Sequence, residues 1–292
     1  MTLAIKSYAK INWTLDVLFK REDGFHELRT IYQTVSLHDT LRLAVTAGAI
    51  EIACDDARVP TDESNLVHKA ATRLRAAAGV TAGARIEITK RIPVAAGLGG
   101  GSSNAAATLL GLARLWQANL SERELFDIAA GLGSDVPLFL IGGTVLGVGR
   151  GEEVYPLEQV ECRELLLANA GVAVSTAAAY AGLSRLTRQE ALRIMPFTLF
   201  AAKAIRELPL VAANDLEETV LAAHPEIAEV KRRLKGCGAR HVLMSGSGGT
   251  VWAVFDNSET NERAQAELRA AGCWAERARA ISRREYHETL FE

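Results

Sequence analysis

A glycine-rich run is the part of the sequence whose composition most directly predicts chemistry. It reads Pro93-Val94-Ala95-Ala96-Gly97-Leu98-Gly99-Gly100-Gly101-Ser102-Ser103, between a predicted strand at 85–89 and an alanine- and leucine-rich stretch at 104–116 that predicts a buried helix. Glycines let backbone N–H groups approach an anion without obstruction by a Cβ, and a helix beginning near Ser103 would point its positive end at the same place. The order strand, glycine loop, helix therefore predicts a phosphate-binding loop.

The loop departs from two common nucleotide-binding motifs. No Gly-Lys-[Ser/Thr] closes it, as a Walker A loop requires, and no Asp or Glu ends a second strand, as a dinucleotide fingerprint requires. A glycine cluster alone can also be a tight turn. The position before a helix and the two adjacent hydroxyls favour phosphate binding. We expect one of Ser102 and Ser103 to cap the helix and the other to reach a phosphate oxygen or Mg²⁺.

The elements that must position this loop are predicted from hydrophobic periodicity. Alternation at 11–17 predicts a strand with one buried face, and Asp23-Gly24 predicts the turn after it. Further strands are predicted at 41–45, 50–54, 165–168 and 251–255, and further helices after a cap at Asp62 or Ser64, after a capping box at 121–124, at 188–207, and from Pro225 to a C-terminal cap at Gly236. Strands and helices interleave in both halves, so the predicted fold class is α+β.

Length and charge limit the kinds of partner. With 292 residues and 49% hydrophobic content, the chain is expected to form two domains, residues 1–158 and 159–292. A net charge of −2 gives no reason to expect a nucleic-acid or membrane partner, so a small molecule is the expected ligand. Four scattered cysteines without a CxxC pair predict neither a zinc site nor a disulfide framework. No signal peptide and no apolar run of about 20 residues is found, which predicts a cytoplasmic protein.

Several motifs together resemble the GHMP kinase superfamily. They are Tyr8-Ala9-Lys10-Ile11-Asn12, Asp23-Gly24-Phe25-His26, the loop 97–104, Gly133-Ser134-Asp135-Val136-Pro137 and, near the C-terminus, Ser245-Gly246-Ser247-Gly248-Gly249. The resemblance implies an N-terminal domain like the second domain of ribosomal protein S5 and a ferredoxin-like C-terminal domain, with ATP and substrate meeting in the cleft between them. The chain departs from the usual pattern at Trp13, Phe25 and Gly248-Gly249.

The first two motifs imply a particular reaction within the superfamily. It is the ATP-dependent phosphorylation of the C2 hydroxyl of a cytidine diphosphate derivative of methylerythritol, in the non-mevalonate route to isoprenoid precursors. By resemblance, Asp135 accepts the proton of that hydroxyl, while Lys10 lowers the pKa of the hydroxyl or of the surroundings of Asp135 and stabilises the transferred charge. Taken singly, Asp135 could be a helix or turn cap and Lys10 a solvated strand charge.

The same resemblance implies the binding residues. Those for ATP are Asn65, Pro93, Ala95, Gly97, Leu98, Gly99, Gly100, Gly101, Ser102 and Ser103, and those for the acceptor are Asn12, Phe25, His26, Tyr32 and Tyr180. Asn65 would lie beside the adenine, although it could equally cap a helix. Mg²⁺ would be held mainly by the phosphates, near Ser102 or Ser103, with no metal cage built from protein ligands.

Phe25, His26 and Tyr180 are expected to form a cytosine pocket. The rings of Phe25 and Tyr180 would sandwich the base, and His26 would form the hydrogen bonds that select it. In the alternative interpretation, both rings are core aromatics and His26 is a turn residue. Two other functions stay open, namely a different GHMP kinase acting on mevalonate, homoserine or a sugar, and a nucleotide-binding homologue without activity. The sequence does not distinguish a monomer from a homodimer.

Overall fold

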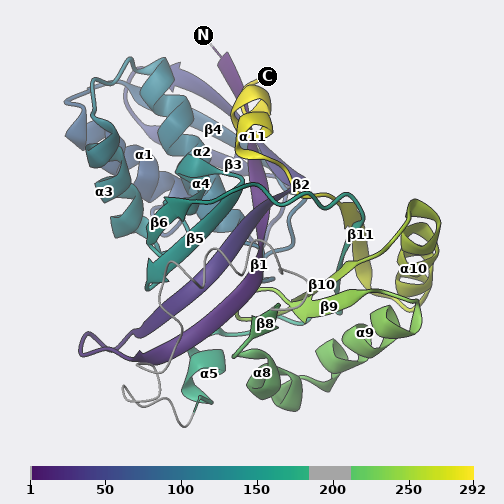
Figure 1. Ribbon diagram of the computed structural model, residues 1–292. Helices are drawn as coiled ribbons and strands as arrows, with labels where there is room; N and C mark the ends of the chain where they lie inside the picture. Colours follow the sequence, from purple (N-terminus) through teal and green to yellow (C-terminus); the bar gives the residue numbers. More distant parts are fainter. Residues whose placement is uncertain (1, 184–211) are drawn as a thin grey trace.

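Two β-sheets with helices on their outer faces make up the part of the chain that the computed structural model describes, residues 2–183 and 212–292 (Figure 1). Among these residues, the larger sheet has seven strands in the order β3-β4-β2-β1-β8, with β5 paired to β2 and β6 to β5. The smaller sheet has four strands in the order β11-β7-β10-β9. The α+β prediction is confirmed, whereas the helix predicted at 188–207 lies outside the described residues.

Two long strands, β1 Thr2–Lys20 and β2 His26–Thr46, form the centre of the larger sheet. The other strands are β3 Ile50–Cys54, β4 Gly83–Thr89, β5 Thr144–Gly149, β6 Glu153–Pro156, β7 Leu165–Asn169, β8 Ala213–Asn214, β9 His241–Met244, β10 Thr250–Val254 and β11 Trp274–Ala278. The helices are α1 Leu66–Ala77, α2 Gly100–Leu115, α3 Glu122–Leu132, α4 Leu138–Ile141, α5 Thr176–Ala181, α8 Glu217–Ala223, α9 Pro225–Gly236, α10 Ser258–Ala270 and α11 Arg283–Thr289. Each strand predicted at 11–17, 41–45, 50–54, 85–89, 165–168 and 251–255 matches or lies largely within an observed strand.

The smaller sheet has the topology of a ferredoxin-like fold. Along the chain come β7, α5, then β8 of the larger sheet, helices α8 and α9, β9, β10, α10 and β11. Every neighbouring pair in the order β11-β7-β10-β9 is antiparallel. This is the β-α-β-β-α-β arrangement of that fold. The fold implied for the C-terminal half is therefore confirmed.

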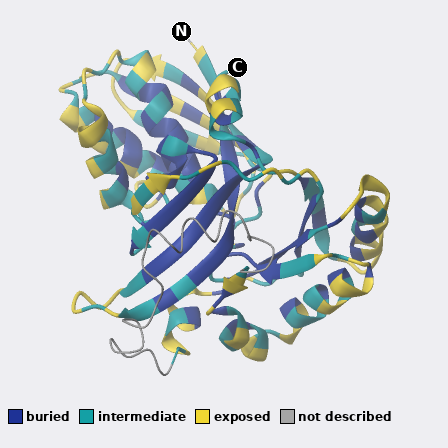
Figure 2. Cartoon of the chain, in the orientation of Figure 1, coloured by how far each residue is buried: buried dark blue, intermediate teal, exposed yellow. Residues whose placement is uncertain are grey.

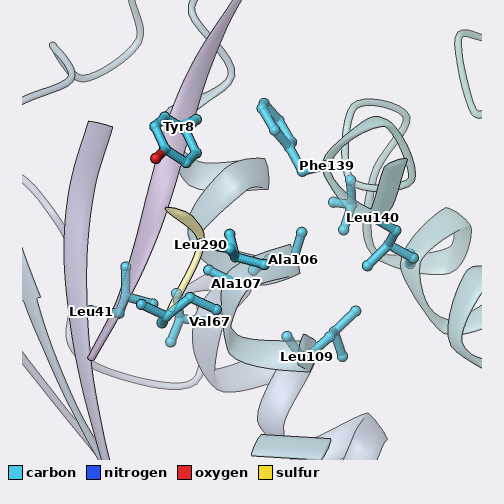
Figure 3. Close-up of a cluster of buried hydrophobic side chains, with 14 of the residues drawn as sticks. Tyr8, Leu41, Val67, Ala106, Ala107, Leu109, Phe139, Leu140 and Leu290 are labelled. Atoms are coloured by element: carbon cyan, nitrogen blue, oxygen red, sulfur yellow. The ribbon is translucent and has the colours of Figure 1, made fainter. Parts of the chain in front are cut away.

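The larger sheet packs one face against α1, α2 and α4 and forms the first hydrophobic core. Leu41 of β2 lies in this core with Val67 of α1, Leu109 of α2 and Phe139 of α4 (Figure 3). The end of the chain returns to the same core, because Leu290, just after α11, packs there too. The boundary at residue 158 stays a prediction, and the C-terminal residues add to the core of the first half.

The other face of β1 is covered by the smaller sheet. The Trp13 ring meets the Trp252 ring edge to face, with 4.9 Å between centroids, and the Trp252 indole N–H donates to the backbone oxygen of Asn12 at 3.0 Å. Asn12 and Thr14 are buried as well, and Figure 2 shows the middle of β1 in the dark blue of buried residues. The prediction that this strand has a single buried face is wrong, since both faces of β1 are covered in the middle of the molecule.

The sequence predicted some helix ends correctly and others incorrectly. The capping box of Ser121 and Glu124 is confirmed, and Pro225 is the first residue of α9. The N-cap of α1 is Asn65 rather than Asp62 or Ser64, because its side chain accepts a hydrogen bond from the Val67 N–H. Gly236 is the last residue of α9 rather than its cap. In the described ranges, no helix is long and apolar enough to cross a lipid bilayer.

Asp16 gives a testable pH dependence of stability. Burial raises its pKa to about 6, the Asp215 carboxylate adds to the shift, and the Arg29 cation opposes it. Because the folded-state pKa lies above the ordinary 3.8, protonated Asp16 contributes to the free energy of unfolding. This contribution is fully present below pH 3.8 and is lost as the pH rises through about 6. We expect Asp16→Asn to raise the free energy of unfolding at pH 8, by at most roughly 3 kcal/mol, and to change it little near pH 4.

Urea unfolding of Asp16→Asn at the two pH values measures this effect. The exposed Asp127→Asn on α3 is the matched control and should change stability at neither pH. An equal gain for Asp16→Asn at both pH values would contradict a cause in the ionisation of Asp16.

Candidate active site

The glycine loop leads directly into α2, and a glycine forms the helix start. Gly99 is the N-cap of α2 with φ 70°, in the left-handed region that glycine adopts most easily, and no side chain caps the helix. The helix begins at Gly100 and not near Ser103, so the expectation that one serine is the N-cap is wrong. The free N–H groups of the first turn therefore belong to the glycine run itself, which suits an anion.

The two serines of the loop face different surroundings. Ser102 lines the clefts on both sides of the loop. Ser103 is buried, and its hydroxyl accepts a 2.7 Å hydrogen bond from the Ser7 hydroxyl. Its N–H donates to the Gly99 oxygen within the helix at 2.8 Å. Of the two hydroxyls, that of Ser102 is the one that can reach a phosphate or a metal ion.

Two clefts meet at the glycine loop. The loop-side cleft, of about 350 Å³, lies between the loop and the start of α1. The hairpin-side cleft, of about 740 Å³, extends to the tip of the β1–β2 hairpin and to α5. Ala95, Gly97, Gly99 and Ser102 line both clefts, so a group bound on one side would lie next to a group bound on the other.

Most of the predicted site residues line one of these clefts. The loop-side cleft is lined by Asn65, Pro93, Ala95, Gly97, Leu98, Gly99, Gly100, Gly101 and Ser102. The hairpin-side cleft is lined by Lys10, Asn12, Phe25, His26, Tyr32, Asp135 and Tyr180. The predicted ATP residues thus gather on one side and the predicted catalytic and acceptor residues on the other, with Ser103 alone behind the loop.

Lys10 and Asp135 form an ion pair at the floor of the hairpin-side cleft. The Lys10 Nζ lies 3.6 Å from Asp135 Oδ2, and its side chain is buried, with 4% of the surface exposed. The Lys10 N–H donates to the Leu98 oxygen at 3.0 Å, which fixes the lysine beside the glycine loop. Asp135 lies between α3 and α4 and caps neither helix. Neither residue is the solvated charge or the simple cap of the alternative interpretation.

Neighbouring side chains fix the orientation of this pair. The Lys10 Nζ donates to Asn12 Oδ1 at 2.7 Å, and the Asn12 amide donates in turn to Thr30 Oγ1 at 2.7 Å. Thr30 donates to the Thr14 oxygen at 2.6 Å, so its hydroxyl must accept from Asn12 and the amide oxygen must face Lys10. The chain of donors therefore holds the ammonium group in one place.

Tyr32 binds the other oxygen of the Asp135 carboxylate. Its hydroxyl donates to Asp135 Oδ1 at 3.2 Å, and the Lys10 Nζ lies 5.5 Å from the centre of its ring. Burial, together with the negative charge of Asp135, raises the pKa of the Tyr32 hydroxyl well above its ordinary value. The hydroxyl therefore keeps its proton at neutral pH and acts as a donor to the carboxylate.

Two aromatic residues of the hairpin-side cleft stack on each other, and a third contacts an arginine. The Tyr180 ring stacks on the His26 ring, with 5.1 Å between centroids and 24° between planes. Phe25 is 52% exposed, and its ring lies against the Arg150 guanidinium at 4.9 Å. The His26 ring occupies one face of Tyr180, and the sandwich of Phe25 and Tyr180 around a base stays a prediction. Burial, with the nearby Lys20 charge, lowers the pKa of His26, which favours the neutral ring.

The glycine motif at 245–249, next to β9 of the smaller sheet, contacts the glycine loop. The Ser245 hydroxyl donates to the Gly97 oxygen at 3.0 Å, and the Thr250 N–H donates to the Ala96 oxygen at 3.1 Å. A Cβ at Gly97 would lie 2.3 Å from the Ser245 oxygen, so only glycine allows the two loops to approach this closely. The motif therefore holds the glycine loop against the C-terminal half.

A buried polar cluster beneath the loop was missed by the sequence reasoning. Asp39 is fully buried, pairs with Lys90, and accepts from the Arg91 and Ile92 N–H groups at 2.7 and 2.8 Å. The Asn104 amide of α2 also donates to it at 3.0 Å. The cluster fixes both ends of the glycine loop. The sequence carried little signal for it, because β2 carries several other polar residues and the partners of Asp39 lie too far along the chain to be identified from spacing.

Asn65 serves as a structural cap at the edge of the loop-side cleft. Its Oδ1 accepts from the Val67 N–H at 2.9 Å, and its Nδ2 donates to the Pro60 oxygen at 2.5 Å. The capping role that the sequence left open is therefore observed, and the side chain lines the cleft as well. In the described part of the chain, no three His, Cys, Asp or Glu residues gather to hold a metal ion.

Comparison with known proteins identifies the family. The model of the GHMP kinases N terminal domain matches residues 65–143, and that of the GHMP kinases C terminal matches residues 199–272. The 4-diphosphocytidyl-2-C-methyl-D-erythritol kinase of Geobacter sulfurreducens is 41% identical over 280 residues, which cover 96% of this chain and 99% of the relative. The chain belongs to the GHMP kinase family. This GHMP kinase is accordingly a small-molecule kinase.

A further relative and a solved structure of this GHMP kinase's family bear the same enzyme's name. The enzyme of the same name from Shouchella clausii is 42% identical, over 92% of this chain and 91% of the relative. A crystal structure of 4-(cytidine 5'-diphospho)-2C-methyl-D-erythritol kinase has a TM-score of 0.78 and 34% identity, covering 96% of this chain and all of that one. The homoserine kinase of Cytophaga hutchinsonii has a TM-score of 0.74 at 19% identity, a likeness that concerns the fold alone.

Proposed function

We propose that this kinase transfers the γ-phosphoryl group of ATP to the C2 hydroxyl of 4-diphosphocytidyl-2-C-methyl-D-erythritol, in the non-mevalonate route to isoprenoid precursors. The observation that carries the proposal is the place of the Lys10–Asp135 pair, on the acceptor side of a glycine loop that is shared by two clefts. The choice of acceptor rests on relatives of about 40% identity along nearly the whole chain, which bear that enzyme's name.

Asp135 and Lys10 have complementary parts in the proposed transfer. The Asp135 carboxylate orients the acceptor hydroxyl and takes its proton as the new P–O bond forms. Tyr32 and Lys10 each bind one oxygen of this carboxylate, so it stays in a fixed orientation while open to the cleft. Lys10 also supplies positive charge close to the loop, where the transferred group carries spread negative charge.

The loop-side cleft is proposed as the site of ATP. The N–H groups of Gly100 and Gly101 begin α2, and their partial positive charge suits the phosphates. Magnesium ion bound to ATP would neutralise phosphate charge, and the Ser102 hydroxyl is the protein oxygen on the loop that is open to it.

The hairpin-side cleft is proposed to bind the cytidine end of the acceptor near Phe25 and His26. The neutral His26 ring has one donor and one acceptor nitrogen, as recognition of cytosine requires, and Phe25 exposes a ring face for stacking. We expect Phe25→Ala and His26→Ala each to raise KM for the acceptor by roughly tenfold and to leave KM for ATP nearly unchanged. Steady-state kinetics with each substrate varied in turn measures both constants.

A control variant separates this effect from a general loss of structure. Phe255→Leu in the core of the smaller half should change neither KM, since the residue lies outside both clefts. Normal acceptor KM in both Phe25→Ala and His26→Ala would place the base elsewhere.

Release of ADP with a panel of alcohols tests the reaction itself. With ATP and Mg²⁺, the cytidine diphosphate derivative should give rapid ADP release, whereas mevalonate, homoserine, galactose and free methylerythritol should not. Turnover of one of the simple alcohols would favour another GHMP kinase activity, and release with none of them would favour a nucleotide-binding homologue. A cytoplasmic location and a monomer or homodimer complete the proposal.

A further inference from the structure

Arg150 lies at a point where two segments of the acceptor site meet. It follows β5 directly, and its guanidinium carbon lies 4.9 Å from the centre of the Phe25 ring, at the tip of the β1–β2 hairpin. Its backbone N–H donates to Glu152 Oε2 at 2.6 Å, and its Nε donates to Glu152 Oε1 at 2.9 Å. The turn after β5 therefore holds the guanidinium group in place.

The Phe25 side chain is half exposed at the tip of the hairpin. The residue is 52% exposed, and the neighbouring His26 stacks on Tyr180 instead. Within residues 2–183 and 212–292, the guanidinium of Arg150 is the one group that contacts the Phe25 ring in a cation–π geometry. Because a phenyl ring has no hydroxyl by which it could be anchored, an exposed Phe25 would otherwise sample several rotamers.

We propose that Arg150 is a positioning residue for the acceptor, acting through Phe25. A guanidinium group on one face of the ring restricts its rotation and leaves the opposite face for the base of the acceptor. Preorganisation of this kind strengthens binding by reducing the ordering that binding requires. The inference rests on the proposed function, since it takes the ligand at Phe25 to be a cytidine.

A direct role for Arg150 would leave a different signature. The Nη groups could instead bind the diphosphate of the acceptor, as could Lys20, which also lines the cleft and pairs with His26 in the strand register. A direct phosphate contact affects CDP but not cytidine, and it does not depend on the Phe25 ring. A positioning role affects both ligands equally and vanishes when the ring is removed.

The test is a double-mutant cycle on ligand binding. Cytidine, CDP and ATP are titrated by calorimetry into the wild type, Arg150→Met, Phe25→Ala and the double variant. We expect Arg150→Met to weaken cytidine and CDP by the same factor, roughly threefold to tenfold, the size of one cation–π contact. In the Phe25→Ala background the same substitution should have no further effect, and ATP affinity should be unchanged throughout.

Two further variants keep the result interpretable. Glu152→Gln weakens the anchor of Arg150 without removing the cation, so it should weaken both ligands in the same direction by a smaller factor. Arg240→Met, at an exposed arginine of the smaller half, should change nothing. Loss of CDP affinity alone, or an undiminished effect in the Phe25→Ala background, would overturn the positioning role. If the wild type binds ATP but neither cytidine nor CDP, the proposed acceptor fails, and the positioning role of Arg150 with it.

Discussion

Asp135→Asn is expected to lower kcat by at least about a hundredfold, the low end for loss of a general base. The asparagine amide has nearly the shape of the carboxylate and can still accept the Tyr32 hydrogen bond at Oδ1, but it cannot take a proton from the acceptor hydroxyl. Asp135 lines the hairpin-side cleft only, so KM for ATP should change little. Measurement of kcat and both KM values by ADP release checks this result.

The control is Asp256→Asn, an exposed aspartate of the smaller half that pairs with Arg240. It removes one negative charge without approaching either cleft and should retain full activity. Near-normal turnover in Asp135→Asn would show that the carboxylate is not the proton acceptor. A fall in ATP affinity of the same size as the fall in kcat would point to a distorted loop instead.

The Lys10→Met variant extends this experiment to the ion pair. This substitution should also reduce kcat strongly, because the Lys10 Nζ lies 3.6 Å from Asp135 and the Lys10 backbone is hydrogen-bonded to the glycine loop. Since the two residues act on the same transfer, the double variant should lose far less than the product of the two single losses. Strictly multiplicative losses would mean that the lysine and the aspartate act in separate steps.

Much of the site could be located from sequence because its parts are local. The glycine run, the strand before it and the helix after it are contiguous, and their order is the observed one. The bounds of β3 and of the capping box were also predictable, since each depends on residues only a few positions apart. The start of α2 was not, because its N-cap is a left-handed glycine, and a glycine run does not reveal which member adopts that conformation.

Contacts between residues far apart in the sequence could not be predicted. The Tyr32–Asp135 hydrogen bond joins residues 103 positions apart, and the Trp252–Asn12 bond joins residues 240 apart. Neither separation leaves a periodic signal in the chain. The second of these bonds belongs to the interface that buries both faces of β1, which a single strand pattern cannot reveal. The same holds for the His26–Tyr180 stack, since the three aromatic residues could be predicted from the sequence but not which two would pair.

A substitution at Gly101 should separate ATP binding from folding. A Cβ at this position would have nothing nearer than the Leu66 Cδ1 at 4.0 Å, and both residues line the loop-side cleft. The added side chain would therefore enter the space proposed for the phosphates without a clash inside the protein. Gly100 is a poorer choice, because its Cβ would approach Ile92 at 3.0 Å and Lys90 at 3.2 Å.

We expect Gly101→Val to weaken ATP binding by at least roughly tenfold, with Gly101→Ala intermediate, because the valine methyl groups occupy more of the cleft. The thermal midpoint should not fall, since glycine is the weaker helix former of the pair. Calorimetric titration with ATP and Mg²⁺ measures the affinity. Gly236→Val in α9 is the matched control, because it is also a helical glycine with open space around its Cβ, and it should bind ATP normally. Unchanged ATP affinity in Gly101→Val would move the phosphate site away from the first turn of α2, even if Asp135 and Lys10 proved essential for turnover.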